Sequence, residues 1–351
     1  MNGTFAYSGI NTKIHGMKSK LITMREYKEI ACMSSVPEVM RYLQGTNGYK
    51  NLFPESADDD FYHRENLEQL LTLSMYENYS SIYTFATISQ RKFLDMYFVH
   101  YETRLIKQLL RKTMNKRPLT VDYTTLQPYF DRFSDIPVQK CFQAETTEDL
   151  ISSLSGTRYY KTLEAVNAMP EKNLFDYEIS LDLYLFKTLW KEKNKYLKGE
   201  DLQIVTDMYG YKIDLLNLQW IYRCKKYYRM TPAEIYNMVI PVRHKLKAVQ
   251  IHAMVESDSV KNFLDVLSDT FYGGNLSELD NISIEKYYNR KIYKLYTSAF
   301  RKHPYSLACI MTYLYLQEQE IQLLTQITEG VRYSYPPEDI IKLINNGGDY
   351  H

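Results

Sequence analysis

The side chains with the clearest potential for chemistry are three adjacent aspartates, Asp58, Asp59 and Asp60, in the stretch SADDDFYHRE at 56–65. Three acids can hold Mg²⁺, and a helical synthase of the prenyl type would place D-D-x-x-D on one helix wall. Adjacent residues instead point in different directions around a helix axis, and the sequence has no second acidic cluster that could complete a metal site with them. A solvated loop or a helix start is therefore the favoured interpretation, and metal chemistry is the minor alternative.

Other signatures of catalysis are missing from the sequence. No G-x-x-x-x-G-K-[ST] or G-x-G-x-x-G segment is present to cradle a phosphate. No H-E-x-x-H pair occurs, and His244 and His252 are too far apart to share a metal easily. We therefore expect no enzymatic activity, no cofactor and no metal.

The thiols are scattered, which excludes a zinc knuckle and, without a leader peptide, indicates a reducing cytoplasm; they are Cys32, Cys141, Cys224 and Cys309.

The charge balance argues against a nucleic-acid binder. Lys and Arg number 43 against 42 Asp and Glu, a net charge of +1. Basic stretches with interleaved aromatic residues lie at 187–198, 223–229 and 243–247. A solvated helix face explains them best, a docking surface for an acidic protein comes next, and nucleic acid is the weakest interpretation.

The longest apolar run, LACIMTYLYL at 307–316, is too short to cross a membrane. As a helix it would reach only ~15 Å, about half of a bilayer core. We therefore expect no direct insertion into a membrane, although the protein can sit beside one.

The elements that carry these residues are predicted to be helices almost throughout. Apolar residues recur at helical spacing at 10–21, 179–197 and 260–267, and sustained alternation is nearly absent. Thr23-x-x-Glu26 and Thr231-Pro-x-Glu234 have the pattern of capping boxes. Ser35 and Thr146 begin similar segments. The sequence therefore predicts an all-α protein.

A short phrase recurs three times: LQGTNGY at 43–49, LSGTRYY at 154–160 and LSDTFY at 267–272. The threonines fall at 46, 157 and 270, so the spacings are 111 and 113. Each phrase follows an apolar-periodic stretch and has glycine at or near it, which indicates a helix end. We expect the threonine to bond the frayed carbonyls and a tyrosine ring to fold back on the last turn.

A second segment also recurs three times, at 102–111, 214–223 and 320–329. Each copy opens with an acid, and the first two close with Arg111 and Arg223, whereas the third closes with Glu329. The order of the two repeats is constant, so we predict three pseudo-symmetric helical modules at 1–118, 119–241 and 242–351. Pro118 and Pro241 discourage continuing helix at the joints.

The helix YKIDLLNLQWIYRCKKYY at 211–228 is apolar on two sides, which predicts that it is packed between layers. Asp214, Asn217 and Arg223 then need partners, because an unpaired buried polar group costs several kcal/mol. Two interpretations stay open. These groups form an internal network that holds modules together, or they stand on a polar cavity wall that receives a partner.

This helix resembles the signature D-x-x-N-L-x-x-x-x-R-x-K of the C subunit of V-type and A-type ATPases, called the d subunit in eukaryotes. The opening FAYSGINTKIHGMKSKLIT and the segments LSGTRYYKTLE and FDYEISLDLYLFKTLWK are also similar to that family. The resemblance runs nearly end to end. It departs in module one, where Leu105 replaces the Asn, and in module three, where Leu323 and Glu329 replace both Asn and Arg.

The resemblance implies three modules arranged as a funnel around a central axis. It implies a non-catalytic central-stalk rotor subunit that couples the shaft, built from the D and F subunits, to the membrane proteolipid ring (the c or K subunit). The protein would then be cytoplasmic and peripheral to the membrane. By resemblance, Asp214, Asn217, Arg223 and Arg111 are the candidate partner-binding residues. Neither the ion, H⁺ or Na⁺, nor the direction of work follows from the sequence.

Two alternatives remain beside the rotor subunit. A generic α-helical scaffold would show repeats of 34–45 residues, whereas this unit is near 110. A helical enzyme would need the missing second acidic cluster.

Overall fold

The computed structural model describes residues 3–54, 61–116, 119, 122–273 and 283–346. Every regular element in these residues is a helix, and none of them is a strand, so the prediction of an all-α protein is confirmed. Asp58, Asp59 and Asp60 lie outside the described residues. No described helix combines the length and the apolar character that crossing a membrane requires.

The helices recur in one order, in which shorter helices precede two long ones. The first set is α1 (Gly3–Lys18), α2 (Met24–Ala31), α3 (Val36–Gly45), the 3₁₀ turn η1 (Lys50–Leu52), α4 (Arg64–Phe85) and α5 (Ile88–Asn115). The second is α6 (Tyr123–Phe133), α7 (Val138–Gln143), α8 (Thr147–Ser153), α9 (Tyr160–Asn167), α10 (Leu174–Tyr196) and α11 (Gly199–Arg223). The third is the π-turn η3 (Cys224–Tyr228), α12 (Pro232–Met238), α13 (Ala248–Glu256), α14 (Val260–Ser268), α15 (Ile284–Lys302) and α16 (Leu307–Arg332), followed by α17 (Pro337–Asn346).

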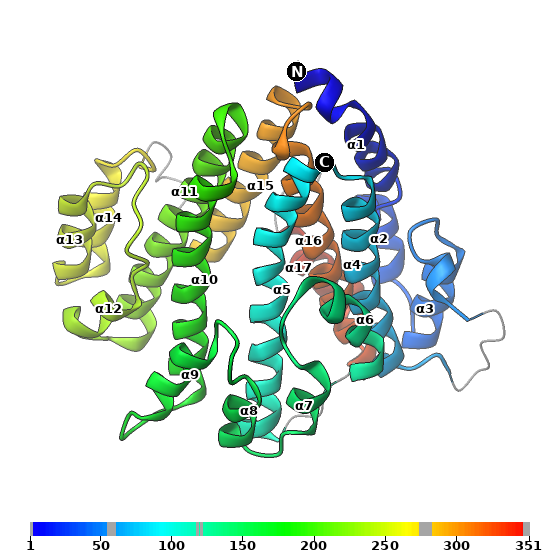
Figure 1. Ribbon diagram of the computed structural model, residues 1–351, viewed down its shortest axis with the longest axis horizontal. Coiled ribbons are helices and arrows are strands. Elements are labelled where there is room, and N and C mark those ends of the chain that lie inside the picture. Colours follow the sequence, from blue (N-terminus) through cyan, green and yellow to red (C-terminus); the bar gives the residue numbers. More distant parts are fainter. Residues whose placement is uncertain (1–2, 55–60, 117–118, 120–121, 274–282, 347–351) are drawn as a thin grey trace.

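The long helices run side by side through the middle of the molecule (Figure 1). Helix α5 packs on α10, α11 on α15, and α16 on α4, so each last long helix contacts the first long helix of another set. The two ends of the chain meet, because α1, α2 and α3 all contact α16. Figure 1 shows α12, α13 and α14 gathered at one side of the long helices and α2 and α3 at the other. The division at 118 and 241 stays a prediction.

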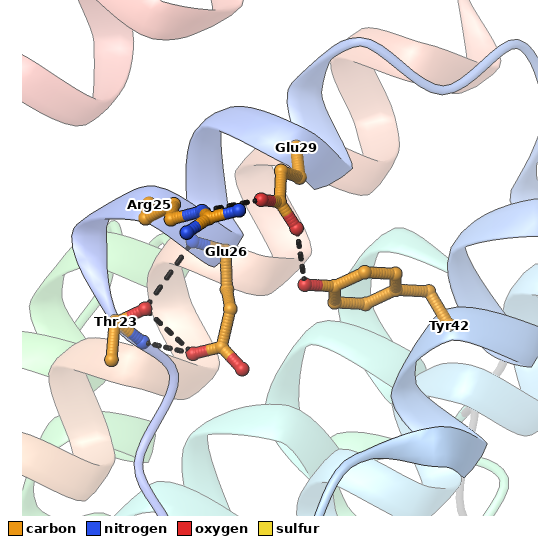
Figure 2. Close-up of polar contacts among 5 residues, drawn as sticks. All are labelled: Thr23, Arg25, Glu26, Glu29 and Tyr42. Atoms are coloured by element: carbon orange, nitrogen blue, oxygen red, sulfur yellow. Dashed lines mark hydrogen bonds and ion pairs between the residues drawn. The ribbon is translucent and has the colours of Figure 1, made fainter.

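The predicted helix starts are confirmed. Thr23, Thr146 and Thr231 each form a capping box, which satisfies amides that the first helical turn leaves unpaired. Figure 2 shows the box at α2, where Thr23 Oγ1 donates to the Glu26 carboxylate at 2.7 Å and accepts from the Glu26 amide at 3.3 Å. At α3, Ser35 accepts from the Glu38 amide, while the Glu38 carboxylate binds Ser34.

Beside the same cap, a short polar chain joins α2 to α3 (Figure 2). The Glu29 carboxylate accepts a 2.9 Å bond from Arg25 Nε and a 2.8 Å bond from the hydroxyl of Tyr42. Arg25 is almost fully exposed, so the ion pair contributes little, and the tyrosine bond links α2 to α3 at the surface.

The two-sided packing predicted for α11 is also confirmed. Leu215, Leu218 and Tyr222 are buried in the main core. On the other side, Ile213 joins a second, smaller core with residues of α10 and of the segment after α12; its buried members are Phe186, Ile213, Ile240 and Val242. The helical spacing predicted over residues 10–21 is partly wrong, since α1 ends at Lys18 and Leu21 lies beyond it.

Candidate partner-binding site

The three threonine phrases adopt the same local structure. Each threonine hydroxyl donates a 2.7 Å hydrogen bond to the carbonyl oxygen three residues earlier, as expected for a side chain that satisfies a helix end. The pairs are Thr46 with Leu43, Thr157 with Leu154, and Thr270 with Leu267.

The tyrosine of each phrase makes a contact that the sequence did not predict. Its hydroxyl donates to the acid that opens one of the repeated long-helix segments. The distances are 2.7 Å from Tyr49 to Glu320, 2.6 Å from Tyr159 to Glu102, and 3.0 Å from Tyr272 to Asp214. In the predicted division, each tyrosine contacts the acid of the preceding module, and the first module closes the circle with the third. We call these three pairs the tyrosine–acid contacts.

Each acid is also held by the chain that precedes the phrase. Three backbone amides, those of His244, Lys245 and Leu246, donate to Asp214 at 3.2, 2.6 and 3.0 Å. This segment lies close on α11 at Gly210, where a Cβ atom would stand 2.5 Å from the ring of His244. In the other copies, the Ile22 amide donates to Glu320 at 2.5 Å and the Ser134 hydroxyl donates to Glu102.

Asn217 is fully buried one turn after Asp214 and binds backbone only. Its amide nitrogen donates to the Ile240 carbonyl at 3.0 Å, and its amide oxygen accepts from the Ile240 N–H at 2.8 Å. Both polar ends of the side chain are therefore satisfied. For Asp214 and Asn217 the structure shows the internal network, and neither side chain reaches solvent.

The last position of the repeated segment forms an ion pair with the start of a neighbouring long helix. Arg111 lies 2.7 Å from Glu178 on α10, and Arg223 lies 3.7 Å from Glu285 on α15. The third copy has the opposite polarity, since Glu329 lies 2.5 Å from Arg64 on α4.

A polar cavity of about 400 Å³ opens where α5, α10 and α16 meet. Helix α5 supplies its cations, Arg104, Lys107 and Arg111, and the acids come from the other two helices as Asp182 and Glu318. Its remaining lining residues are His100, Tyr101, Thr103, Gln108, Leu185 and Gln322. We call this space the central cavity.

The charges in and beside the central cavity are set by burial. The Lys107 ammonium lies 2.6 Å from Asp182, yet burial outweighs it and raises the pKa of that carboxyl. Burial also lowers the pKa of Lys212, against the opposing pull of Glu318 and Asp182. Burial and the Lys212 charge together hold the pKa of His100 well below its ordinary value, so this imidazole is neutral at pH 7.

Of the four residues predicted from the sequence, the structure brings only Arg111 to the central cavity. Arg223 is half-exposed near the far end of α11, and Asp214 and Asn217 lie inside the fold. Sequence reasoning missed Lys107, Asp182 and Glu318. Their signal is weak, because they come from three helices far apart in the chain and follow no common motif.

The central cavity has charged and hydrogen-bonding walls. Within the described ranges, no three His, Cys, Asp or Glu residues come close enough to hold a metal ion. The same residues contain four free cysteines, of which only Cys32 is exposed. The arrangement is suited to orienting a polar surface of another molecule by complementary charge.

Comparison with known proteins gives a consistent result along the whole chain. A sequence profile of the family described as ATP synthase (C/AC39) subunit matches residues 10–343. The chain is 24% identical to the A-type ATP synthase C subunit of Methanosphaera stadtmanae over 354 residues, which span 96% of this chain and 87% of that protein. It is 24% identical to the same subunit of Thermococcus kodakarensis over 347 residues, which span 96% of this chain and 90% of that protein. It is 23% identical to the subunit of Methanocaldococcus jannaschii over 355 residues, which span 96% of this chain and 86% of that protein.

Proposed function

This chain belongs to the ATP synthase (C/AC39) subunit family, and we propose that it is the non-catalytic rotor subunit that couples the D/F shaft to the membrane proteolipid ring. As part of a rotary ATPase it would pass torque between two neighbours and carry out no chemical step of its own. We infer that it is peripheral to the membrane, on the cytoplasmic face.

The observation that carries the proposal is the central cavity, taken with the family match. Its walls come from α5, α10 and α16, one helix from each predicted module, as an axial cup would require. Its charged side chains can fix the orientation of a protein end that enters it. We propose that the foot of the shaft binds here and that Arg104 and Arg111 contact it.

A rotor subunit also has to be stiff enough to transmit torque, and the tyrosine–acid contacts support this role. The tyrosine–acid contacts tie each short-helix region to a long helix from elsewhere in the chain. We propose that Asp214 and Asn217 act by holding residues 240–246 against α11, which stiffens the fold. In this account they affect partner binding only through the shape of the protein.

The test is co-purification of the full-length protein with its partners in mild detergent. We expect recovery of D, F and proteolipid subunits with the wild-type chain. The variant R104E/R111E should lose about tenfold or more in affinity for the shaft while keeping the ring, because charge reversal at a buried interface contact costs several kcal/mol. A matched variant, R25E/K28E, changes the same charge on exposed α2 and should bind both partners normally.

Two outcomes would contradict the proposal. Recovery of neither shaft nor ring subunits would favour the generic scaffold. Shaft binding that is insensitive to R104E/R111E would remove the central cavity from the proposal.

A further inference from the structure

A groove between α11 and α15 has an apolar floor and a cationic edge. Its volume is about 470 Å³, which lies within the range of specific binding sites. We call it the α11/α15 groove. The apolar residues include Ile204, Met208, Leu215, Leu295 and Phe271, and the cationic edge on α15 consists of Lys291, Lys294 and Lys302.

The groove has a counterpart between α16 and α4. The tyrosine–acid contacts relate the two. Tyr272 lines the α11/α15 groove and binds Asp214 beneath it, and this pair corresponds to Tyr49 and Glu320, which both line the other groove. The other wall of each groove is α15 or α4, and these two helices can be aligned by Glu285 and Arg64, which form the equivalent ion pairs. In that register Leu295, Ser298, Ala299 and Lys302 correspond to Ser74, Glu77, Asn78 and Ser81, and all eight line their grooves.

In the α16/α4 groove the occupant is known, because it is part of this chain. Helix α1 contacts both α4 and α16, and Lys13 and Met17 of α1, with Lys20 just after it, line the groove. The wall beneath carries Glu77 and Glu320. An acidic groove is thus covered by a helix that presents lysines and an apolar residue.

The α11/α15 groove has the opposite polarity and a different cover. Its described lining consists of α11, α15, Phe271, Tyr272 and His303, without a third helix. Asp207 is the one acid among these described lining residues, and it lies 3.2 Å from His244. The lysines on α15 therefore face the groove without a matching acidic wall.

In the related region between α5 and α10, side chains contact one another at the corresponding positions. Arg158, which corresponds to Phe271, lies 4.0 Å from Glu192, which corresponds to Ala299. The Tyr159 and Tyr184 rings are in contact at a centroid distance of 5.4 Å. In the α11/α15 groove the smaller Ala299 stands in place of Glu192 and Phe271 in place of Arg158, so this ion pair has no counterpart there.

We propose that the α11/α15 groove binds an acidic amphipathic helix of a partner protein. Such a helix would insert its apolar side chains between α11 and α15 and place its carboxylates against Lys294 and Lys302, as α1 does with reversed charges in the α16/α4 groove. This interface goes beyond the proposed shaft site, since the central cavity and the α11/α15 groove share no lining residue among those described.

The test measures binding of synthetic helices to the full-length protein by fluorescence anisotropy. One stapled peptide of about 18 residues carries leucines spaced three and four apart, flanked by glutamates, and its partner peptide carries lysines instead. We expect the acidic peptide to bind about tenfold or more tightly than the basic one and to weaken with salt. The variant K294E/K302E should reverse this preference.

The chain supplies a matched control at the corresponding positions of α10, where K187E/K195E makes the same charge change on exposed residues. This control should leave acidic-peptide binding unchanged. Equal binding of both peptides, or equal loss in both variants, would overturn the proposal. Lysine-dependent binding of anionic phosphatidylglycerol vesicles without peptide binding would overturn it as well, in favour of a lipid headgroup site. If the shaft co-purifies normally while the acidic peptide fails to bind, only this second interface is lost.

Discussion

The Glu329 carboxylate lies 2.5 Å from the Arg64 guanidinium, at the position where the other two copies of the repeat place Arg111 and Arg223 against glutamates. The third copy therefore keeps the contact and exchanges the charges of its two ends. In the sequence alone, this copy differs from the others by the loss of its arginine. The ion pair explains the departure, because only opposite charge between the two helices is needed, and either helix can supply either sign.

A double-mutant cycle tests this ion pair. We expect R64Q and E329Q each to destabilise the protein and the pair to show a coupling of about 0.5–1 kcal/mol, since both side chains are partly exposed. The measurement is urea unfolding of the two single variants and the double variant. The same cycle on the more exposed pair Arg25 and Glu29 should give a smaller value. A coupling near zero at Arg64 and Glu329 would show that the contact is incidental.

The tyrosine–acid contacts predict a sharp difference between two neighbouring residues. Tyr159 is fully buried and donates to the Glu102 carboxylate at 2.6 Å, whereas Tyr160 donates to Glu164 at the surface. Y159F should cost about 1.5–3 kcal/mol, because a hydrogen bond to a charged group is lost and the carboxylate stays buried. Y160F should cost less than about 0.5 kcal/mol. The comparison uses denaturant midpoints, and similar losses for both variants would contradict the assigned role of Tyr159.

Much of the local structure could be predicted from the sequence. Capping residues and threonine bonds act within four residues of their partners, so spacing alone identifies Thr23 and Thr157. The family resemblance is confirmed by the match over residues 10–343. The acids and the tyrosines are each recognisable as repeats. Their pairing is not, because Tyr49 and Glu320 lie 271 residues apart, and helical periodicity does not say which helices become neighbours.

The central cavity was the least predictable part of the site. Lys107, Asp182 and Glu318 belong to three different helices, and each alone has the spacing of an ordinary polar residue. Asp214 and Asn217 show that the resemblance does not reveal whether a residue is buried. The resemblance made them candidate contacts to a partner, whereas their side chains are fully buried against the backbone of residues 240–246.

Asn217 allows that distinction to be measured. N217A leaves the Ile240 N–H without its buried acceptor and leaves the Ile240 carbonyl with only its 2.8 Å bond from the Val242 amide, so we expect a loss of about 1–3 kcal/mol in the free energy of unfolding. At a temperature where the variant is still folded, its affinity for the shaft should stay within about twofold of wild type. The control is N194A, at an exposed asparagine with a 3.5 Å bond to the Trp190 carbonyl and a 3.2 Å bond from Lys193, and it should change both quantities much less. A large loss of affinity in folded N217A would restore the direct-contact interpretation.

The buried carboxyl of Glu320 predicts how stability depends on pH. Burial raises its pKa from 4.5 to about 7, although the bonds from Tyr49 and the Ile22 amide act in the opposite direction. Because the folded state then holds a proton that the unfolded state has released, the free energy of unfolding should fall as pH rises from 4.5 to about 7 and level off above. A shift of this size corresponds to about 3 kcal/mol. Urea titrations between about pH 5 and pH 8 should show this fall in the wild type, and E320Q should reduce its slope, because a glutamine cannot titrate. Equal slopes in both proteins would mean that Glu320 titrates near its ordinary value and that the junction between α16 and the N-terminal segment is insensitive to pH.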